Sequence, residues 1–420
     1  MRRLRSAQAA LAAGLLAVLP GGASAAGASE VPRASGVFAP KTDYPVGHNP
    51  RAVATGDLTG SGRTDLVVAD AADGTVSILL NNGDGTFAPR RTYPAGPGPS
   101  SVAVGDLRGI GVSDLVVADQ DGDGVSVLLG NGDGTFRPPR RLATGPHPDA
   151  VALGDFRGTG TLDLAVANLG DFGDGSVSLL LGNGDGTFQP ARSYPTGDNS
   201  NPASIALADL GGSGNLDLAV ALDGVGEVAV FPGNGDGTLG APTGYRVGGI
   251  PVSLAVGDLR GDGRLDLVLA DSENSARVLL GNGDRTFRPV RSYPAGSAPV
   301  SVVVGDFTRS GAADLALATG GNSATLLLGN RDGTFRAPQS YPTGSGDHST
   351  PDRVAAGRFT VGGGLDLAVT NAQDDTVSVL LNTADRPGPW PRPGAAPAPG
   401  QRASGPSGAT QEELSPTVTM

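Results

Sequence analysis

The amino-acid sequence predicts an all-β protein, a closed seven-bladed β-propeller of four-stranded blades. Three observations predict this fold. A unit of roughly 50 residues recurs seven times, which is the period of a propeller blade. Each unit contains four short runs rich in Val and Leu, which Gly, Asn and Asp separate. The strand that the seventh unit lacks stands at the front of the chain, where it would close the ring.

Each repeat is marked by an acidic loop between its first two predicted strands. These loops begin at Asp57, Asp106, Asp155, Asp209, Asp258 and Asp306, with Arg358 in the seventh place. In the second copy the four apolar runs read "SVAVGD", "DLVVAD", "VSVLLG" and "TFRPPRRL". Runs of this length and composition are typical of strands rather than helices, so each copy is predicted to form one sheet.

A second acidic turn, "NGDG", follows the third predicted strand of several repeats. It suits a hairpin to the fourth strand, because its glycines accept positive φ angles. The Phe that follows the turn is expected to pack between blades. The turns lie at 82–85, 131–134, 183–186 and 234–237, and the Phe residues are Phe87, Phe136, Phe188, Phe287 and Phe335.

The two ends of the repeat array predict how the ring closes. The seventh copy stops after "DTVSVLLN" (375–382), and no "GNGDGTF" follows it. At the front, "GVFAPKTDYPVG" (36–47) aligns with "GTFAPRRTYPAG" (85–96). We therefore expect this N-terminal segment to be the fourth strand of the last blade, which leaves no open edge. The rival, an open calcium-binding β-roll, needs a nine-residue Gly/Asp period that the sequence lacks.

The segments that flank the repeats predict an exported protein. Residues 1–25 read as a signal peptide, with an arginine-rich start, the apolar run "AALAAGLLAVLP" and the small residues "ASA" for cleavage. The alternative is an N-terminal anchor. The prediction is a linker over 26–35, the propeller over 36–382 and a disordered tail rich in Pro, Ala and Gly over 383–420. No later segment reads as a membrane helix, so a secreted, extracellular protein is expected.

Composition excludes several classes of function. The formal charge of −12 disfavours binding to nucleic acid. The absence of cysteine excludes disulfides and thiolate zinc sites.

The repeats resemble a known family. The motifs "GNGDGTFRP" (130–138), "LGNGDGTFQP" (181–190) and "GDLRGDGRLDLVLAD" (257–271) are similar to FG-GAP repeats, also called VCBS repeats, of a secreted bacterial type. The best-known members form the seven-bladed head of integrin α chains. The resemblance covers residues 36–382. It implies a propeller whose loop between the first two strands of a blade often holds Ca²⁺, on a scaffold that serves adhesion, sugar binding and enzyme appendages alike.

Oxygen ligands for such a Ca²⁺ ion would come from positions 1, 3, 5 and 9 of the loop, with a backbone carbonyl at 7. The fifth loop offers Asp258, Asp262 and Asp266 at positions 1, 5 and 9, and the carbonyl of Arg264 at position 7. Position 3 is Arg260, which has no acceptor and cannot be a ligand.

The other loops offer smaller ligand sets. Two fill all four side-chain positions, with Asp57, Thr59, Ser61 and Asp65, and with Asp306, Thr308, Ser310 and Asp314. Two lack position 3 and offer Asp155, Thr159 and Asp163, and Asp209, Ser213 and Asp217. The second and seventh loops are expected to hold no metal. We predict structural Ca²⁺ in some blades only. The alternative is that the aspartates cap the turns by accepting backbone N–H groups, with Arg side chains in place of the metal charge.

Insertions in the repeats predict where a partner binds. Three segments vary in length, at 168–176, 196–204 and 343–353. All three are expected on the face opposite the acidic loops, and two flank the boundary of the third and fourth blades. Because function gathers in such loops, the predicted contacts are Asp171, Asp174, Asp198, Asn199 and Asn201. Drift in unconstrained loops is the alternative.

The sequence shows no convincing nucleophile–base pair, nucleotide loop or histidine cluster. It predicts a secreted, non-catalytic binding or adhesion module that recognises an extracellular glycan or cell-surface protein. The alternative is an extracellular hydrolase or lyase with its active site in the central channel. The sequence does not predict an oligomeric state.

Overall fold

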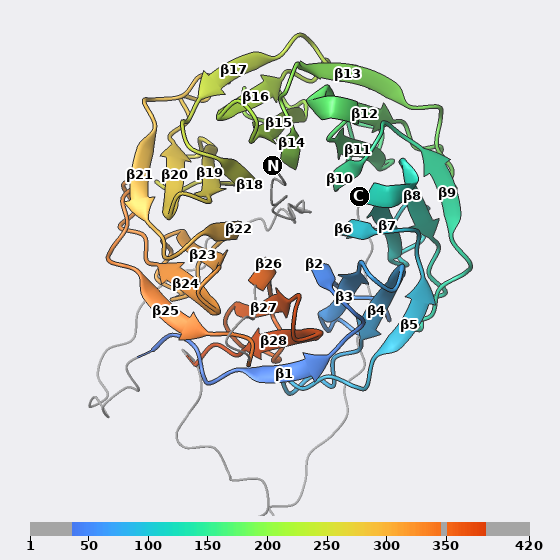
Figure 1. Cartoon of the computed structure of the whole chain (residues 1–420), viewed down its shortest axis with the longest axis vertical. Coiled ribbons are helices and arrows are strands. Elements are labelled where there is room, and N and C mark those ends of the chain that lie inside the picture. The colour runs from blue at the N-terminus through green and yellow to red at the C-terminus, as the bar shows by residue number, and fades with distance from the viewer. Residues whose placement is uncertain (1–35, 346–350, 384–420) are drawn as a thin grey trace, which may run out of the picture. The chain divides into compact units, whose positions relative to one another are not determined.

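The computed structural model describes residues 36–345 and 351–383. The predicted signal peptide, linker and, apart from Thr383, tail lie outside these residues. The described chain forms seven four-stranded sheets around a central axis (Figure 1), so the predicted all-β, seven-bladed propeller is confirmed. In the described part of the chain, no helix is long and apolar enough to span a bilayer.

Each blade is an antiparallel meander that runs from an inner strand at the axis to an outer strand. The first blade contains β2 (Pro50–Gly56), β3 (Asp65–Asp70), β4 (Thr75–Leu79) and β5 (Arg91–Pro94). The second contains β6 (Pro99–Gly105), β7 (Asp114–Asp119), β8 (Gly124–Leu128) and β9 (Arg140–Ala143). The third contains β10 (Pro148–Gly154), β11 (Asp163–Asn168), β12 (Gly175–Leu180) and β13 (Arg192–Gly197).

The remaining blades repeat this order. The fourth contains β14 (Pro202–Ala208), β15 (Asp217–Leu222), β16 (Glu227–Phe231) and β17 (Thr243–Arg246). The fifth contains β18 (Pro251–Gly257), β19 (Asp266–Asp271), β20 (Ser275–Leu279) and β21 (Arg291–Pro294). The sixth contains β22 (Pro299–Gly305), β23 (Asp314–Thr319), β24 (Ser323–Leu327) and β25 (Gln339–Pro342). The seventh contains β26 (Pro351–Gly357), β27 (Asp366–Asn371) and β28 (Thr376–Leu380). Two 3₁₀ turns are η1 (Gln120–Gly122) and η2 (Asp171–Gly173).

The N-terminal strand β1 (Thr42–Pro45) closes the ring as its sequence predicts. It pairs antiparallel with β28, in register from Thr42 opposite Val379 to Pro45 opposite Thr376. A further bridge joins Phe38 to Asn382. The last blade therefore takes its outer strand from the front of the chain, and its outermost edge is formed like that of every other blade.

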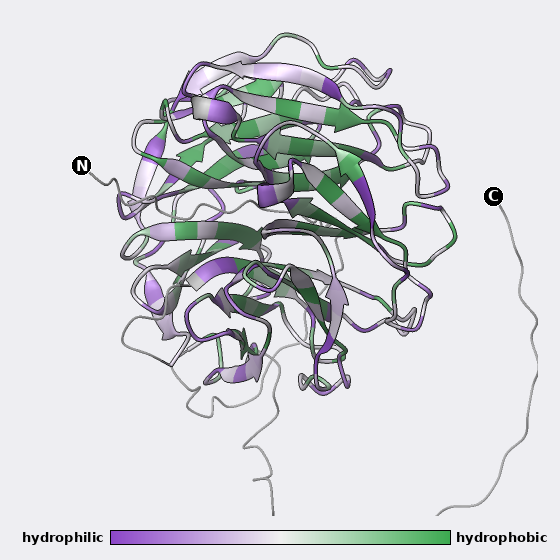
Figure 2. Ribbon diagram, turned by 45° about the vertical axis from the view of Figure 1, so that its right-hand side comes forward, coloured by the Kyte–Doolittle hydropathy of each residue, from purple (hydrophilic) through white to green (hydrophobic). Residues whose placement is uncertain are grey.

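The core lies between neighbouring blades rather than within one. Side chains of β3, such as Val67, pack with side chains of β7, such as Leu115, in one buried cluster. The second strands are buried along their whole length, as sheets covered on both faces should be. The outer strands are mostly exposed and polar (Figure 2). Four of the predicted Phe residues contact a Tyr from the outer strand of the preceding blade, as Phe136 does Tyr93 with ring centroids 5.4 Å apart, and Phe188 packs with Leu142 in the same way. The predicted inter-blade role of these Phe residues is thus confirmed.

The last residue of the second strand is a buried polar group in six of the blades. In the second blade it is Asp119, whose Oδ2 accepts a hydrogen bond from Ser126 Oγ at 2.7 Å. Burial raises the pKa of Asp119 to about 6, although Ser126 and Arg141 act in the opposite direction. The corresponding residue of the third blade is neutral Asn168, whose amide donates to Ser178 Oγ at 3.0 Å. A neutral amide therefore fits this position.

We expect Asp119→Asn to stabilise the propeller above pH 6. A folded-state pKa above the ordinary value of 3.8 means that the fold loses stability as pH rises from about 4 to about 6. The full penalty, at most about 3 kcal/mol, is present at neutral pH. Melting temperatures at pH 5 and 7.5 should show a gain at pH 7.5 and a flatter pH dependence than the parent's. Asp133→Asn, on an exposed turn, is the matched control. A variant less stable than the parent at pH 7.5 would contradict this reasoning.

Candidate functional site

The aspartate at position 9 of each acidic loop ties that loop to the end of the third strand. In the fifth blade, Asp266 Oδ2 accepts the N–H of Leu259 at 3.0 Å and Oδ1 accepts the N–H of Gly281 at 2.8 Å. All seven blades repeat both bonds, and all seven carboxylates are buried. They belong to Asp65, Asp114, Asp163, Asp217, Asp266, Asp314 and Asp366. Position 9 therefore has a structural role in every blade.

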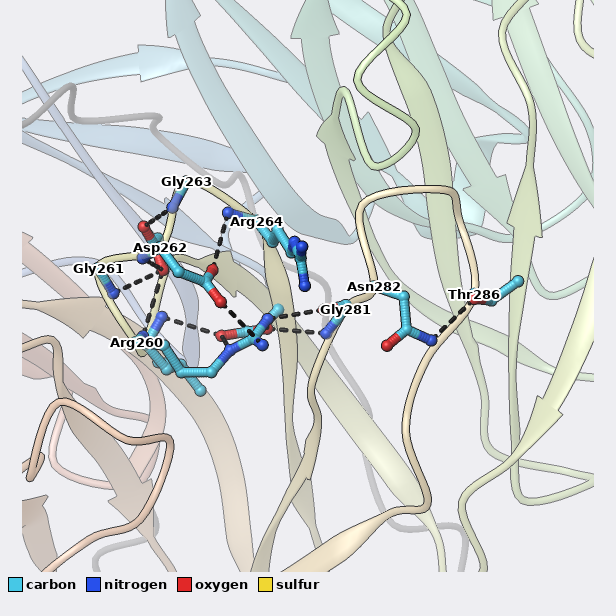
Figure 3. Close-up of polar contacts among 11 residues, drawn as sticks. Arg260, Gly261, Asp262, Gly263, Arg264, Gly281, Asn282 and Thr286 are labelled. Atoms are coloured by element: carbon cyan, nitrogen blue, oxygen red, sulfur yellow. Dashed lines mark hydrogen bonds and ion pairs between the residues drawn. The ribbon is translucent and has the colours of Figure 1, made fainter.

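The aspartate at position 1 caps the turn of its own loop. Asp258 accepts backbone N–H groups from four residues that follow it, at 2.8 to 3.2 Å (Figure 3). Asp57 accepts those of Thr59, Ser61 and Gly62. Partial burial raises the pKa of Asp57, but these N–H groups together outweigh it and lower the pKa. The first loop therefore stabilises the ionised form of Asp57 with its own backbone N–H groups.

In the fifth loop the guanidinium of Arg260 stands between the carboxylates that were predicted to bind Ca²⁺. Its Nη2 donates to Asp266 Oδ1 at 2.8 Å and to the carbonyl of Gly281 at 2.7 Å, and its Nη1 lies 3.0 Å from Asp262 Oδ2 (Figure 3). The Arg260 side chain is only 7% exposed. This loop, with its carbonyl at Arg264, does not fit a metal ion, because a cationic side chain already fills the space between positions 5 and 9.

Two further loops repeat this arrangement within their own blade. Arg108 Nη2 donates to Asp114 Oδ1 at 2.6 Å, and Arg157 Nη2 donates to Asp163 Oδ1 at 2.5 Å. Each also donates to the carbonyl at the end of the third strand. The set predicted at Asp155, Thr159 and Asp163 is thus also neutralised by an arginine, as the alternative interpretation requires.

The fourth loop takes its arginine from the fifth blade. Position 3 is Gly211, where a Cβ atom would lie 2.7 Å from Cζ of Arg285. Arg285 replaces the last glycine of the "NGDG" turn, and it reaches across to donate to Asp217 Oδ1 and to Ser213 Oγ, both at 3.0 Å. The glycine at position 3 therefore makes room for a guanidinium from the neighbouring blade. The ligand set predicted at Asp209, Ser213 and Asp217 therefore already contains a cationic side chain.

The first and sixth loops fit a metal ion best. In the first, Thr59 Oγ1 donates to Ser61 Oγ at 2.9 Å, so the hydroxyls at positions 3 and 5 converge. Burial chiefly raises the pKa of Asp65, and the negative charge of Asp57 adds to the rise.

In the sixth loop Thr308 and Ser310 are joined in the same way at 3.0 Å, and the charge of Asp306 adds to the burial that raises the pKa of Asp314. Two carboxylates that repel each other across two hydroxyls form an oxygen-only ligand set suited to Ca²⁺. Among the described residues no group of three or more His, Cys, Asp or Glu side chains has metal-binding geometry.

The predicted partner contacts lie on the face where the blades are connected, here called the connection face. The loop around η2 meets the segment that leads into β14: a Cβ atom at Gly173 would lie 3.3 Å from Asn199 Cα and 3.3 Å from Asn201 Oδ1. The structure therefore brings together the two inserted loops, which sequence alone placed only near one blade boundary. Asp171, Asp174, Asp198 and Asn199 are exposed, and Asn201 is half-buried.

Sequence reasoning missed a chain of polar contacts at the start of the inner strands. Arg51 Nη1 donates to Gln120 Oε1 at 2.7 Å, and Gln120 Nε2 donates to Asp149 Oδ1 at 2.8 Å. These residues come from the first, second and third blades. Arg51 and Asp149 each follow the proline that begins an inner strand, where the register of the sheet shifts.

This polar chain continues across the axis of the ring. Burial raises the pKa of Asp149 to about 8, Arg353 and Arg51 act in the opposite direction, and Asp223 adds to the rise. Arg353 belongs to the seventh blade, which is not a neighbour of the third (Figure 1). The charge of Arg353 therefore acts on Asp149 from a blade that is not its neighbour. The sequence contained one signal for this cluster. The residue after the proline that begins each inner strand differs from blade to blade, whereas the repeat around it does not.

Comparison with known proteins places the chain in a family. FG-GAP-like repeats match in five overlapping stretches, at 57–109, 109–166, 155–220, 212–269 and 258–317. The chain belongs to this family. The sequence-based resemblance to FG-GAP repeats is thereby confirmed. Five stretches match the family, and the described propeller has seven blades.

Solved structures share the fold of this FG-GAP propeller. A crystal structure of BBS1N in complex with ARL6DN, soaked with mercury, has a TM-score of 0.58 and 14% identity, over 83% of this chain and 98% of that one. A lectin from Agrocybe aegerita, described by its specific recognition of non-reducing terminal N-acetylglucosamine, has a TM-score of 0.51 and 22% identity, over 80% and 86%. At such identities the likeness shows the fold alone. No curated protein matches the chain.

Proposed function

We propose that this FG-GAP propeller is a secreted, non-catalytic binding module that recognises extracellular glycans or other cell-surface ligands through its connection face. The observation that carries the proposal is the meeting of the two inserted loops, which exposes carboxylate and amide groups at one blade boundary. Asp and Asn side chains hydrogen-bond hydroxyl groups well. The lectin of similar fold, whose described ligand is a terminal sugar, is in keeping with this class.

Binding of a glycan by these loops is directly testable. The purified protein is applied to a glycan array, and hits are measured by calorimetry with Asp198→Ala and Asn199→Ala. We expect each variant to weaken binding about tenfold, because each removes polar groups that face the ligand. Asp185→Asn, on the opposite face, is the control and should bind like the parent. An array without hits, or loop variants with unchanged affinity, would overturn the proposal.

An extracellular hydrolase or lyase stays as the second candidate. It is favoured by the carboxyl of Asp149, because a buried carboxyl of raised pKa beside the axis is a candidate general acid. The pKa of Asp352 is likewise raised by burial, to about 6. Release of products from any polysaccharide by the parent protein, and its loss in Asp149→Asn, would decide for the enzyme.

We also propose structural Ca²⁺ in the first and sixth loops, where Thr59 and Thr308 stand at position 3. A bound cation would offset the repulsion between the paired aspartates there. We expect a chelator to lower the melting temperature and excess Ca²⁺ to restore it. The double variant Thr59→Arg, Thr308→Arg supplies the guanidinium that other blades use, so it should melt at the same temperature with and without chelator. A parent protein indifferent to chelation would remove metal from these loops.

A further inference from the structure

We propose that the polar cluster of Arg51, Gln120 and Asp149 beside the axis of the ring, here called the channel site, is a binding site for a neutral polyhydroxylated ligand, a single sugar unit. The inference rests on the glycan-binding function proposed above and places a subsite away from the inserted loops. It is based on two buried polar atoms of this cluster that have no hydrogen-bond partner among the described residues.

The cluster is a built site within the ring. Asp149 is 0% exposed, and its Oδ2 accepts no hydrogen bond from the residues that the structure describes. At the other end of the chain of contacts, Arg51 Nε donates none to those residues. A buried polar atom without a partner destabilises a fold by a substantial amount. Among the described residues, one carboxyl oxygen and one N–H group therefore lack a hydrogen-bond partner, on either side of Gln120.

The charge of the cluster favours a neutral ligand. The charges of Arg51 and Arg353 act on Asp149 and Asp352, and that of Asp223 acts on Asp149, so that groups of both signs lie near any occupant. An isolated ammonium ion would meet two guanidinium groups, and an isolated anion would meet the carboxyl groups of Asp223 and Asp352. Sugar hydroxyls accept from the Nε–H of Arg51 and can either donate to or accept from the carboxyl of Asp149, whose pKa burial raises to about 8. Arg51, Gln120 and Asp352 are partly exposed, which opens the cluster to the connection face.

The apolar positions around the ring suit the other side of a sugar. The residues after the strand-starting proline are polar or charged in the seventh, first, second and third blades. In the fourth to sixth blades they are Ala203, Val252 and Val300, of which Ala203 and Val252 are 0% and 6% exposed and Val300 is half-buried. On the same face, Val225 and Ile250 are 40% and 41% exposed. A sugar ring has a hydroxyl edge for the charged cluster and a C–H face for the exposed apolar groups of Val300, Val225 and Ile250.

Nuclear magnetic resonance on the full chain tests the site directly. The Arg51 Nε–H and Asp149 amide signals are followed while N-acetylglucosamine, galactose, mannose or an array hit is added at millimolar concentration. We expect both signals to shift in a saturable manner. Asp149→Asn and Arg51→Lys should each weaken that binding about tenfold, since lysine keeps the charge but loses the planar set of donors. Asp185→Asn is the control, and melting temperatures confirm that each variant folds.

The outcomes separate this inference from the proposed function. Array hits without shifts at Arg51 and Asp149 would overturn the channel site and leave the glycan-binding function standing. Shifts with simple sugars but no array hits would support the channel site and overturn the wider function. If neither is seen, both fall. Shifts caused by the zwitterion glycine but by no sugar would overturn the assignment to a neutral ligand. If Asp149→Asn does not fold, the shifts and Arg51→Lys decide the question.

Discussion

A chain that begins at His48 is expected not to fold, whereas one that begins at Gly36 should fold like the parent. The shorter chain lacks β1, so β28 loses its outer partner along four paired residues. It also loses Phe38, which is 6% exposed and packs edge-on against Phe307 and Tyr341, at centroid distances of 5.8 and 5.1 Å. Truncating one such Phe to Ala costs about 3–5 kcal/mol. Loss of the whole segment therefore approaches the total stability of an ordinary domain.

Circular dichroism and thermal melting of the two chains measure this effect. Phe38→Ala in the full chain is the milder variant and should lower the melting temperature without abolishing folding. A synthetic peptide of residues 36–47, added to the chain that begins at His48, should restore a cooperative transition by pairing with β28. A chain without β1 that melts like the longer one would show that closure contributes nothing.

Replacing Arg260 by alanine is the second large effect that we expect. The buried Asp266 would lose its charged partner and Asp262 its nearby cation, and an uncompensated buried charge costs about 3–5 kcal/mol. The vacated space would be lined by the carboxylates of Asp258, Asp262 and Asp266. We therefore expect millimolar Ca²⁺ to stabilise this variant more than it stabilises the parent, and so to recover part of the loss.

Urea unfolding with Ca²⁺ or with chelator provides the measurement. Arg264→Ala is the matched control, because this arginine is two positions from Asp266 but exposed; its stability should change by less than about 0.5 kcal/mol. An Arg260→Ala protein as stable as the parent would refute the view that the guanidinium stands in for a metal. Loss of stability without any response to Ca²⁺ would keep that view but deny that the loop can bind the ion.

Local patterns in the sequence were sufficient to predict the architecture. The seven copies, the four apolar runs in each copy and the alignment of 36–47 with 85–96 specify the blades and their closure. The structure has the predicted features because a strand and its hairpin partner lie close together in the chain, so that local patterns specify their pairing. The likeness of the first segment to a fourth strand also let one long-range pairing, β1 with β28, be inferred.

The electrostatic partners of the loop aspartates could be predicted only in part. The arginine at position 3 showed in the sequence that Arg260 is not a ligand. The sequence did not show that its guanidinium bridges Asp262 and Asp266. For the fourth loop, the arginine that fills the gap at Gly211 is Arg285, which belongs to the next blade. Which side chain fills a loop depends on how neighbouring blades pack, and the repeat pattern carries no such information.

By itself, then, the sequence determined a ring of seven four-stranded blades and the residue type at each turn, because those depend on local periodicity and turn chemistry. Only the tertiary structure decided which loops already contain a cation and that the charges of Arg51 and Arg353 act on Asp149. These three residues come from three blades far apart in the chain. Closure of the ring brings them together, and burial there then sets their charge and hydrogen bonding.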